Sequence, residues 1–124
     1  MAGNRAVAQA RALVGTPFRL HGRDARGIDC IGLVAIAYRQ ATVPTGYALR
    51  TADADAVVAP LRVLGFRPRR ARQAGDILVL DAGPAQLHLG LWTGDSLVHA
   101  DAGLRRVVEM PGAPPWPVLS IWRR

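Results

Sequence analysis

Apolar residues recur at helical spacing in the first third of the chain. One set precedes Gly15-Thr16-Pro17, which stops a helix, and a second follows Asp29, which suits a helix N-cap. The two sets are Ala6, Val7, Ala10, Leu13 and Val14, and then Ile31, Leu33, Val34, Ala37 and Tyr38. This spacing predicts a helix up to Val14, a second helix from Asp29 to about Ala41, and a third over residues 52–64, closed by Gly65.

The second half of the chain changes to short apolar runs of strand length, separated by Gly, Pro or Asp. These runs are residues 77–80, 86–92, 97–100, 104–110 and 118–122. Helices followed by strands predict an α+β fold in which N-terminal helices pack on a C-terminal antiparallel sheet. Because the chain has 124 residues, we expect a single domain over residues 1–124.

The charge of the protein is strongly basic. All sixteen basic residues are arginine and the formal net charge is +7, which favours attraction to polyanions such as nucleic acids or acidic cell-wall polymers. Arg67, Arg69, Arg70 and Arg72 cluster in a predicted loop, where Pro68 fixes an extended backbone. A run of charged side chains that simply face solvent would explain this arginine cluster without any binding partner. Specific nucleic-acid binding is not favoured, because no groove-reading motif or array of stacking aromatics accompanies the arginines.

Targeting signals and cofactor motifs are not visible in the sequence. Residues 1–14 lack the continuous apolar segment of a signal peptide, and no apolar run approaches the roughly 18 residues of a membrane span. We therefore expect no membrane span and a protein that is cytoplasmic at synthesis. Cys30 is the only cysteine, which excludes an intramolecular disulfide and a multi-thiolate metal site. No cofactor is expected.

Cys30 occupies the first turn of the second predicted helix. A lone cysteine in an apolar helix is usually a small buried hydrophobic residue. The first turn, however, places the thiol near unpaired backbone N–H groups and the positive end of the helix dipole, and both favour the thiolate. Cys30 is therefore a candidate nucleophile, provided that the fold supplies a base.

A predicted hairpin supplies candidate bases. If Gly94-Asp95 forms a two-residue turn, Trp92 faces Leu97, Leu91 faces Val98, Gly90 faces His99 and His88 faces Asp101. His88 and His99 then project from the same face of the hairpin, as diagonal neighbours roughly 7 Å apart. If the second helix packs on this face, Gly90 leaves room for its backbone and His88 can meet the Cys30 thiol.

Two other interpretations of these histidines remain open. Each could line a half-buried strand without a chemical role. Alternatively, His88, His99 and Asp101 could hold a metal ion in an open site, although Cys30 would then have no role. We expect no metal, and a nucleophile with a base and an orienting group accounts for more of the pattern.

Five segments of the chain are similar to the motifs of one enzyme family. They read G-T-P-F from Gly15, D-C-I-G-L-V from Asp29, G-D-I from Gly75, H-L-G-L-W from His88 and V-H-A from Val98. The family motifs are G-x-P-Y, D-C-S-G-L-V, G-D-L, H-V-G-I-Y and I-H-A. Over most of its length the chain thus resembles the NlpC-type peptidoglycan cysteine endopeptidases, a group within the papain-like superfamily that cuts the stem peptides of the cell wall.

The resemblance implies a role for each matching residue. Cys30 would be the nucleophile, His88 the general base and His99 the residue that orients the imidazole. Asp29 would help to bind the free amine of a trimmed stem peptide, although a plain N-cap explains it equally well. Three substrate-side positions depart from the family pattern, namely Phe18 for a tyrosine, Ile31 for a serine, and His21 in place of a glycine.

The resemblance also implies a substrate and leaves alternatives open. We expect hydrolysis of amide bonds in peptidoglycan stem peptides, between D-glutamate and a diamino acid. Because Phe18 and Ile31 replace polar groups, a catalytically silent module that binds cell-wall peptides is the alternative, and a basic nucleic-acid-binding protein is a second. Small stand-alone members of the family occur with phage-like particles, so the protein would reach the cell wall on such a particle or after lysis.

Overall fold

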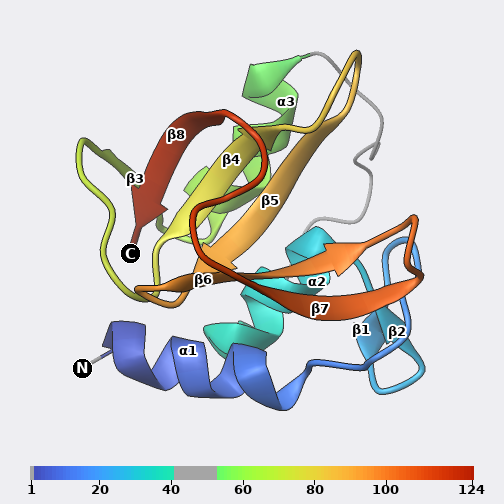
Figure 1. Cartoon of the computed structure of the whole chain (residues 1–124). Coiled ribbons are helices and arrows are strands. Elements are labelled where there is room, and N and C mark those ends of the chain that lie inside the picture. Colours follow the sequence, from blue (N-terminus) through green and yellow to red (C-terminus); the bar gives the residue numbers. More distant parts are fainter. Residues whose placement is uncertain (1, 41–52) are drawn as a thin grey trace.

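The computed structural model describes residues 2–40 and 53–124 (Figure 1). Its helices are α1 (Ala2–Ala12), α2 (Cys30–Ala37) and α3 (Ala54–Val63). Antiparallel strands form a six-stranded sheet in the order β3-β8-β4-β5-β6-β7. Their bounds are β3 Arg67–Arg69, β4 Ile77–Asp81, β5 Leu87–Trp92, β6 Ser96–Asp101, β7 Arg106–Pro111 and β8 Val118–Arg123. The predicted α+β class, with helices before the sheet, is confirmed.

The ends of the helices differ from the predictions at several positions. Helix α1 buries Ala6, Val7 and Ala10 as expected, but it ends at Ala12, and Val14 beyond it is 45% exposed. Helix α2 ends at Ala37, because the chain leaves the helix through Arg39 in a left-handed conformation (φ 55°). The predicted end of α2 at residue 41 and start of α3 at residue 52 lie outside the described residues.

Helix α2 lies between α1 and the sheet, where strands β5 and β6 contact it (Figure 1). Seven of its eight residues are buried, so it has no solvent face. Gly32 makes this packing possible, because a Cβ atom there would lie 2.3 Å from the carbonyl oxygen of Gly22. The glycine thus lets the loop before α2 fold back against the first turn of the helix.

The predicted turn between β5 and β6 is confirmed. The backbone N–H of Thr93 donates to Ser96, while Trp92 pairs with Leu97 and Leu91 with Val98. The β5–β6 ladder consists of these two pairs, and the strands then diverge (Figure 1). The expected pairs of Gly90 with His99 and of His88 with Asp101 therefore do not form, because β5 continues along β4 while β6 continues along β7.

The face of the hairpin on which α2 packs was predicted incorrectly. Residues of α1 and α2 share one core cluster with Leu89, Leu91, Val98 and Ala100, which alternate with the histidines along the strands. On the other face Gly90 meets Leu97, whose Cδ1 atom would lie 2.5 Å from a Cβ at position 90. The space beside Gly90 is thus filled by the neighbouring strand and not by the helix.

Three short strands were not predicted. Strands β1 (Arg23–Asp24) and β2 (Gly27–Ile28) form a small hairpin in the segment expected to be a polar loop. Strand β3, expected as a basic loop, pairs with β8 at an edge of the sheet, and all three of its residues are exposed. Arginine and proline on an edge strand hinder pairing with further strands, so part of the basic cluster has a structural explanation.

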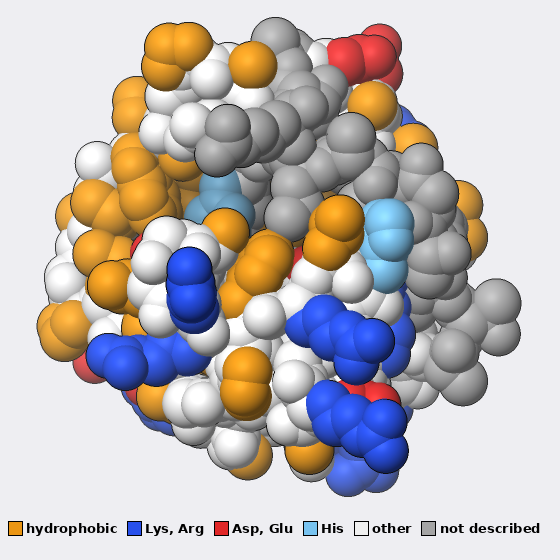
Figure 2. Space-filling model, turned by 90° about the vertical axis from the view of Figure 1, so that its right-hand side faces the viewer, with side chains coloured by type: hydrophobic (Ala, Val, Ile, Leu, Met, Phe, Trp, Pro, Cys, Tyr) orange, Lys and Arg blue, Asp and Glu red, His pale blue; other side chains and the backbone are white. Residues whose placement is uncertain are grey.

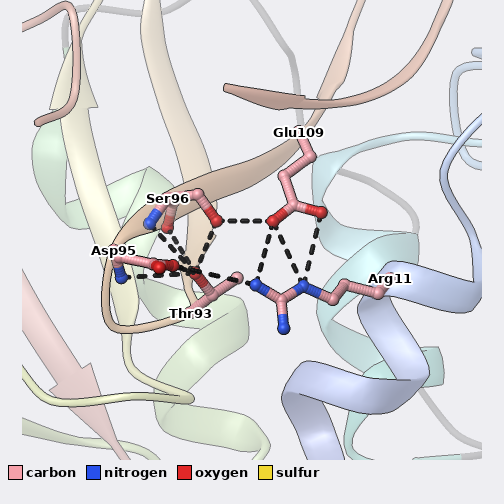
Figure 3. A network of polar contacts seen from close by, with 5 residues as sticks. All are labelled: Arg11, Thr93, Asp95, Ser96 and Glu109. Carbon is pink, nitrogen blue, oxygen red and sulfur yellow. Dashed lines mark hydrogen bonds and ion pairs between the residues drawn. The ribbon is translucent and has the colours of Figure 1, made fainter. Parts of the chain in front are cut away.

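A polar network ties α1 to the far end of the hairpin (Figure 3). Arg11 of α1 donates to Glu109 of β7 at 3.1 Å, and the hydroxyl of Ser96 donates to the same carboxylate at 2.6 Å. Thr93 contacts the Ser96 hydroxyl at 2.5 Å and donates to Asp95 at 3.1 Å. These bonds fix the closed end of the hairpin, whereas the histidines lie toward its open end.

No helix in the described ranges, residues 2–40 and 53–124, is long and apolar enough to cross a lipid bilayer.

Candidate active site

Asp29 and the loop before it hold the start of α2. The Asp29 carboxylate accepts hydrogen bonds from the backbone N–H of Gly32 (2.8 Å), the backbone N–H of His21 (2.8 Å) and the guanidinium of Arg23 (3.1 Å). The side chain is fully buried and caps the helix. These contacts account for both carboxylate oxygens, so the geometry fits the N-cap role and gives no support for contact with a substrate amine.

Cys30 is the first residue of α2 and is 5% exposed. Burial, and secondarily the charge of Asp29, raises the pKa of the thiol to about 12, although backbone amides of Leu89, Ile31 and Cys30 itself act in the opposite direction. The expectation of an easily ionised thiol is therefore wrong for the ligand-free protein, because desolvation outweighs the helix amides. Cys30 is a neutral thiol at pH 7.

His88 of β5 and His99 of β6 are in direct contact. The Nε2 atom of His88 lies 2.9 Å from Nδ1 of His99, and the ring centroids are 5.0 Å apart at an interplanar angle of 86°. Burial, and then the proximity of His99, lowers the pKa of His88 to about 4, while Asp101 opposes this shift. Burial likewise lowers the pKa of His99. Both imidazoles are thus neutral at pH 7, as a base requires.

Two residues outside the predicted set contact the histidine pair. The Nε2 atom of His99 lies 3.0 Å from the sulfur of Met110 on β7. Trp116 stands edge-on to both imidazoles, with centroid distances of 5.7 Å to His88 and 5.4 Å to His99. Trp116 packs against an apolar cluster and also lines the cleft.

A cleft of about 350 Å³ brings the nucleophile and the base together. Its lining residues are Phe18, Cys30, Ala82, Gln86, Leu87, His88, Ala100, Asp101, Ala102, Gly103 and Trp116. In the face shown by Figure 2, a histidine side chain lies in a hollow of the surface. Within residues 2–40 and 53–124, no hydrogen bond joins Cys30 to His88, so the two share the cleft as separate neutral groups.

The predicted substrate-side residues divide between the cleft and the core. Phe18 lines the cleft, as expected. Ile31 does not, because its side chain is 3% exposed and belongs to the apolar core cluster. His21 also lies outside the lining and contributes its backbone N–H to Asp29. Asp101, considered only as a hairpin or metal residue, supplies the carboxylate of the cleft.

Metal ligation has no support in the described ranges. Residues 2–40 and 53–124 contain no group of three His, Cys, Asp or Glu side chains arranged to hold a metal ion. The arrangement of Cys30, His88 and His99 instead resembles a nucleophile, a base and an orienting group, in which the third residue fixes the ring of the second.

Comparisons with known proteins identify the family of the chain. The NlpC/P60 family model matches residues 15–116, whereas the search of curated proteins found no match. Among solved structures, NlpC1 from Trichomonas vaginalis is 23% identical with a TM-score of 0.69, over 98% of this chain and 45% of the other. The chain spans less than half the length of that protein and of NlpC2 from the same organism, 48% of which is covered.

Two further solved structures are covered almost completely and differ in activity. The NlpC/p60 domain of the peptidoglycan hydrolase SagA is 25% identical with a TM-score of 0.60, over 88% of each chain. RipD from Mycobacterium tuberculosis, a non-catalytic NlpC/p60 domain protein adapted to peptidoglycan binding, is 17% identical with a TM-score of 0.62, over 100% of this chain and 97% of the other. The present chain belongs to the NlpC/P60 family, and its described part has the papain-like α+β fold of that family.

Proposed function

We propose that this protein is a cysteine peptidase that hydrolyses amide bonds in peptidoglycan stem peptides, between D-glutamate and the diamino acid. One observation carries the proposal: Cys30 and His88 line the same cleft, and His99 lies 2.9 Å behind the base. Family membership and the similarity to the peptidoglycan hydrolase SagA support the substrate class.

The proposed reaction begins with two neutral groups. Because the pKa of Cys30 is raised to about 12 and that of His88 is lowered to about 4, a preformed thiolate–imidazolium pair is not the resting state. The Nε2 atom of His88 faces His99, so Nδ1 is the atom that receives the thiol proton. This transfer accompanies attack of the sulfur on the amide carbonyl, in the manner of general-base catalysis.

The remaining steps use groups at the start of α2. The backbone N–H groups of Cys30 and Ile31, in the first turn of the helix, are the donors for the oxyanion. The imidazolium of His88 then protonates the leaving amine, which leaves a thioester on Cys30. Water, deprotonated by His88, attacks the thioester, releases the new carboxylate and restores the thiol.

A second candidate function is a module that binds cell-wall peptides without cutting them. Two observations favour it, namely the strongly raised pKa of Cys30 and the phenylalanine, which has no hydroxyl, at position 18 of the cleft. The non-catalytic protein RipD, adapted to peptidoglycan binding, has a similar fold.

Incubation with purified muropeptides separates the two functions. The peptidase releases new amines in stoichiometric amounts with new carboxylates, and Cys30→Ala and His88→Ala abolish release while Cys30→Ala still binds the peptide in calorimetry. A binding module gives the same calorimetric result but no release from the unaltered protein. Release that persists in either variant overturns the assignment of the nucleophile or the base. Phe18→Tyr, which restores a hydroxyl in the cleft, is expected to increase the rate of a working enzyme.

A further inference from the structure

Both ring nitrogens of His99 have a partner, and the two partners differ in chemistry. Nδ1 faces His88 Nε2 at 2.9 Å, and Nε2 faces the Met110 sulfur at 3.0 Å. The His99 side chain is 0% exposed, so bulk water does not reach the ring. The hydrogen-bonding pattern of this ring is therefore set by the protein.

The Met110 sulfur restricts which nitrogen of His99 carries the proton. A thioether accepts hydrogen bonds but has no hydrogen to donate, and a neutral imidazole has one N–H and one lone pair. The contact at 3.0 Å is favourable when His99 Nε2 carries the hydrogen. If Nδ1 carried it instead, a nitrogen lone pair would face the sulfur lone pairs with no proton between them.

The tautomer of His99 in turn determines which nitrogen of His88 carries the hydrogen. With its hydrogen on Nε2, His99 presents the lone pair of Nδ1 to His88, so Nε2 of His88 must be the donor. His88 then keeps its lone pair on Nδ1. Within residues 2–40 and 53–124 no other group forms a hydrogen bond with Nδ1 of His88. This leaves Nδ1 as the free basic atom of the pair.

We propose that Met110 is a positioning residue, whose thioether fixes the tautomers of His99 and His88 and so leaves Nδ1 of His88 as the proton acceptor in the cleft. The catalytic consequence rests on the proposed peptidase function, whereas the tautomers do not. The strand register explains the contact, because Leu97 pairs with Met110 and His99 with Val108, which makes Met110 a diagonal neighbour of His99 on the same face.

The tautomers can be measured without substrate. Long-range ¹H–¹⁵N correlation spectra of protein labelled with ¹⁵N-histidine identify the protonated nitrogen of each ring. At pH 7 the unaltered protein is expected to show hydrogen on Nε2 in both His88 and His99. Hydrogen on Nδ1 of either residue overturns the proposal.

Replacement of the sulfur tests whether Met110 is the cause. The chain has two methionines, so norleucine, which exchanges the sulfur for a methylene group, alters Met1 and Met110 alone. Norleucine and Met110→Leu should both decrease the ratio of the Nε2–H to the Nδ1–H tautomer of His99 about two- to tenfold, the range expected for one net hydrogen bond. Selenomethionine, which keeps an acceptor and has no hydrogen to donate, should preserve this ratio. Unchanged tautomers with norleucine contradict the proposal.

Activity then provides a separate readout. Met110→Leu is expected to lower kcat for muropeptide cleavage by up to about tenfold with little change in KM, whereas selenomethionine should preserve kcat. A Met110→Leu protein that also carries norleucine controls for Met1, and circular dichroism checks the fold. If the tautomers are as expected but no cleavage occurs, only the peptidase function is contradicted. If cleavage occurs but norleucine does not change the tautomers, only the role of Met110 is contradicted.

Discussion

The His88 and His99 imidazoles meet edge to face, with Nε2 of one 2.9 Å from Nδ1 of the other. The two residues belong to strands that separate beyond Leu91 and Val98. Their contact therefore bridges the open end of the hairpin, where the backbones no longer pair. This explains how a ring on β5 is held in a fixed orientation beside the cleft that contains Cys30.

Removal of His99 should impair catalysis more than binding. We expect His99→Ala to lower kcat about 10²- to 10⁴-fold, the range that general acid–base catalysis contributes, because the base loses the partner that orients it, with a smaller change in KM. His99→Gln retains an oxygen that can accept from His88 and should recover part of the rate. Steady-state kinetics on muropeptides measures both. A His99→Ala protein that is folded and as active as the unaltered protein contradicts the orienting role.

The Cys30 thiol should react slowly in the ligand-free protein. Because its pKa is raised to about 12, the thiolate fraction near neutral pH is very small. The rate of alkylation by iodoacetamide should therefore rise with pH through the range 7 to 10 without a plateau, as followed by mass spectrometry. In urea the same thiol should titrate near the roughly 8.5 of a free cysteine. A plateau at or below neutral pH would instead reveal a preformed ion pair with His88.

The hairpin was predictable from the sequence because its geometry is local. A two-residue turn fixes the pairs next to it, Trp92 with Leu97 and Leu91 with Val98, and places His88 and His99 on one face. The pairs expected farther along the strands do not form, but the two imidazoles still meet. The register of the hairpin does not determine which of its two faces α2 covers. That choice depends on tertiary packing, in which Leu89, Leu91, Val98 and Ala100 form an apolar face that joins the core cluster with residues of α2.

Other differences also arise from packing between distant segments. Ile31 follows Cys30 in sequence, but helical geometry turns it into the core beside α1. Desolvation of Cys30 depends on the elements that surround α2, whereas the helix amides that favour the thiolate can be recognised from the sequence. The contact between Met110 and His99 could in principle have been predicted, because extending the register across the β6–β7 turn places the two residues diagonally opposite. The length of that turn, however, was not evident from the sequence.

Asp101 should tune the basicity of the histidine pair. Its carboxylate raises the pKa of His88, in opposition to burial. In Asp101→Asn the imidazolium loses this stabilisation, so the pKa of His88 should fall further below about 4. A titration of His88 by NMR measures the shift, and the acid limb of kcat/KM should move to lower pH with it. Asp95→Asn, at the exposed closed end of the hairpin, should leave the titration unchanged.

The Ser96–Glu109 hydrogen bond should make stability depend on pH. The Ser96 hydroxyl, and then Arg11, lowers the pKa of Glu109 from its ordinary value of 4.5. A carboxyl group whose pKa is lower in the folded state stabilises the fold above pH 4.5, and the contribution is lost as the pH falls through the folded-state pKa. Ser96→Ala should therefore lower the free energy of unfolding by about 1–2 kcal/mol at pH 7 and by less near pH 3.

Urea denaturation at the two pH values checks this dependence, and Ser120 provides a matched control. The Ser120 hydroxyl accepts a hydrogen bond of 2.8 Å from the Trp122 indole, a neutral donor. Ser120→Ala should thus destabilise the protein by about 1 kcal/mol at both pH values, because neither partner changes charge. If the effect of Ser96→Ala is as large at pH 3 as at pH 7, the hydroxyl acts through Thr93, to which it is also bonded, and not through the Glu109 charge.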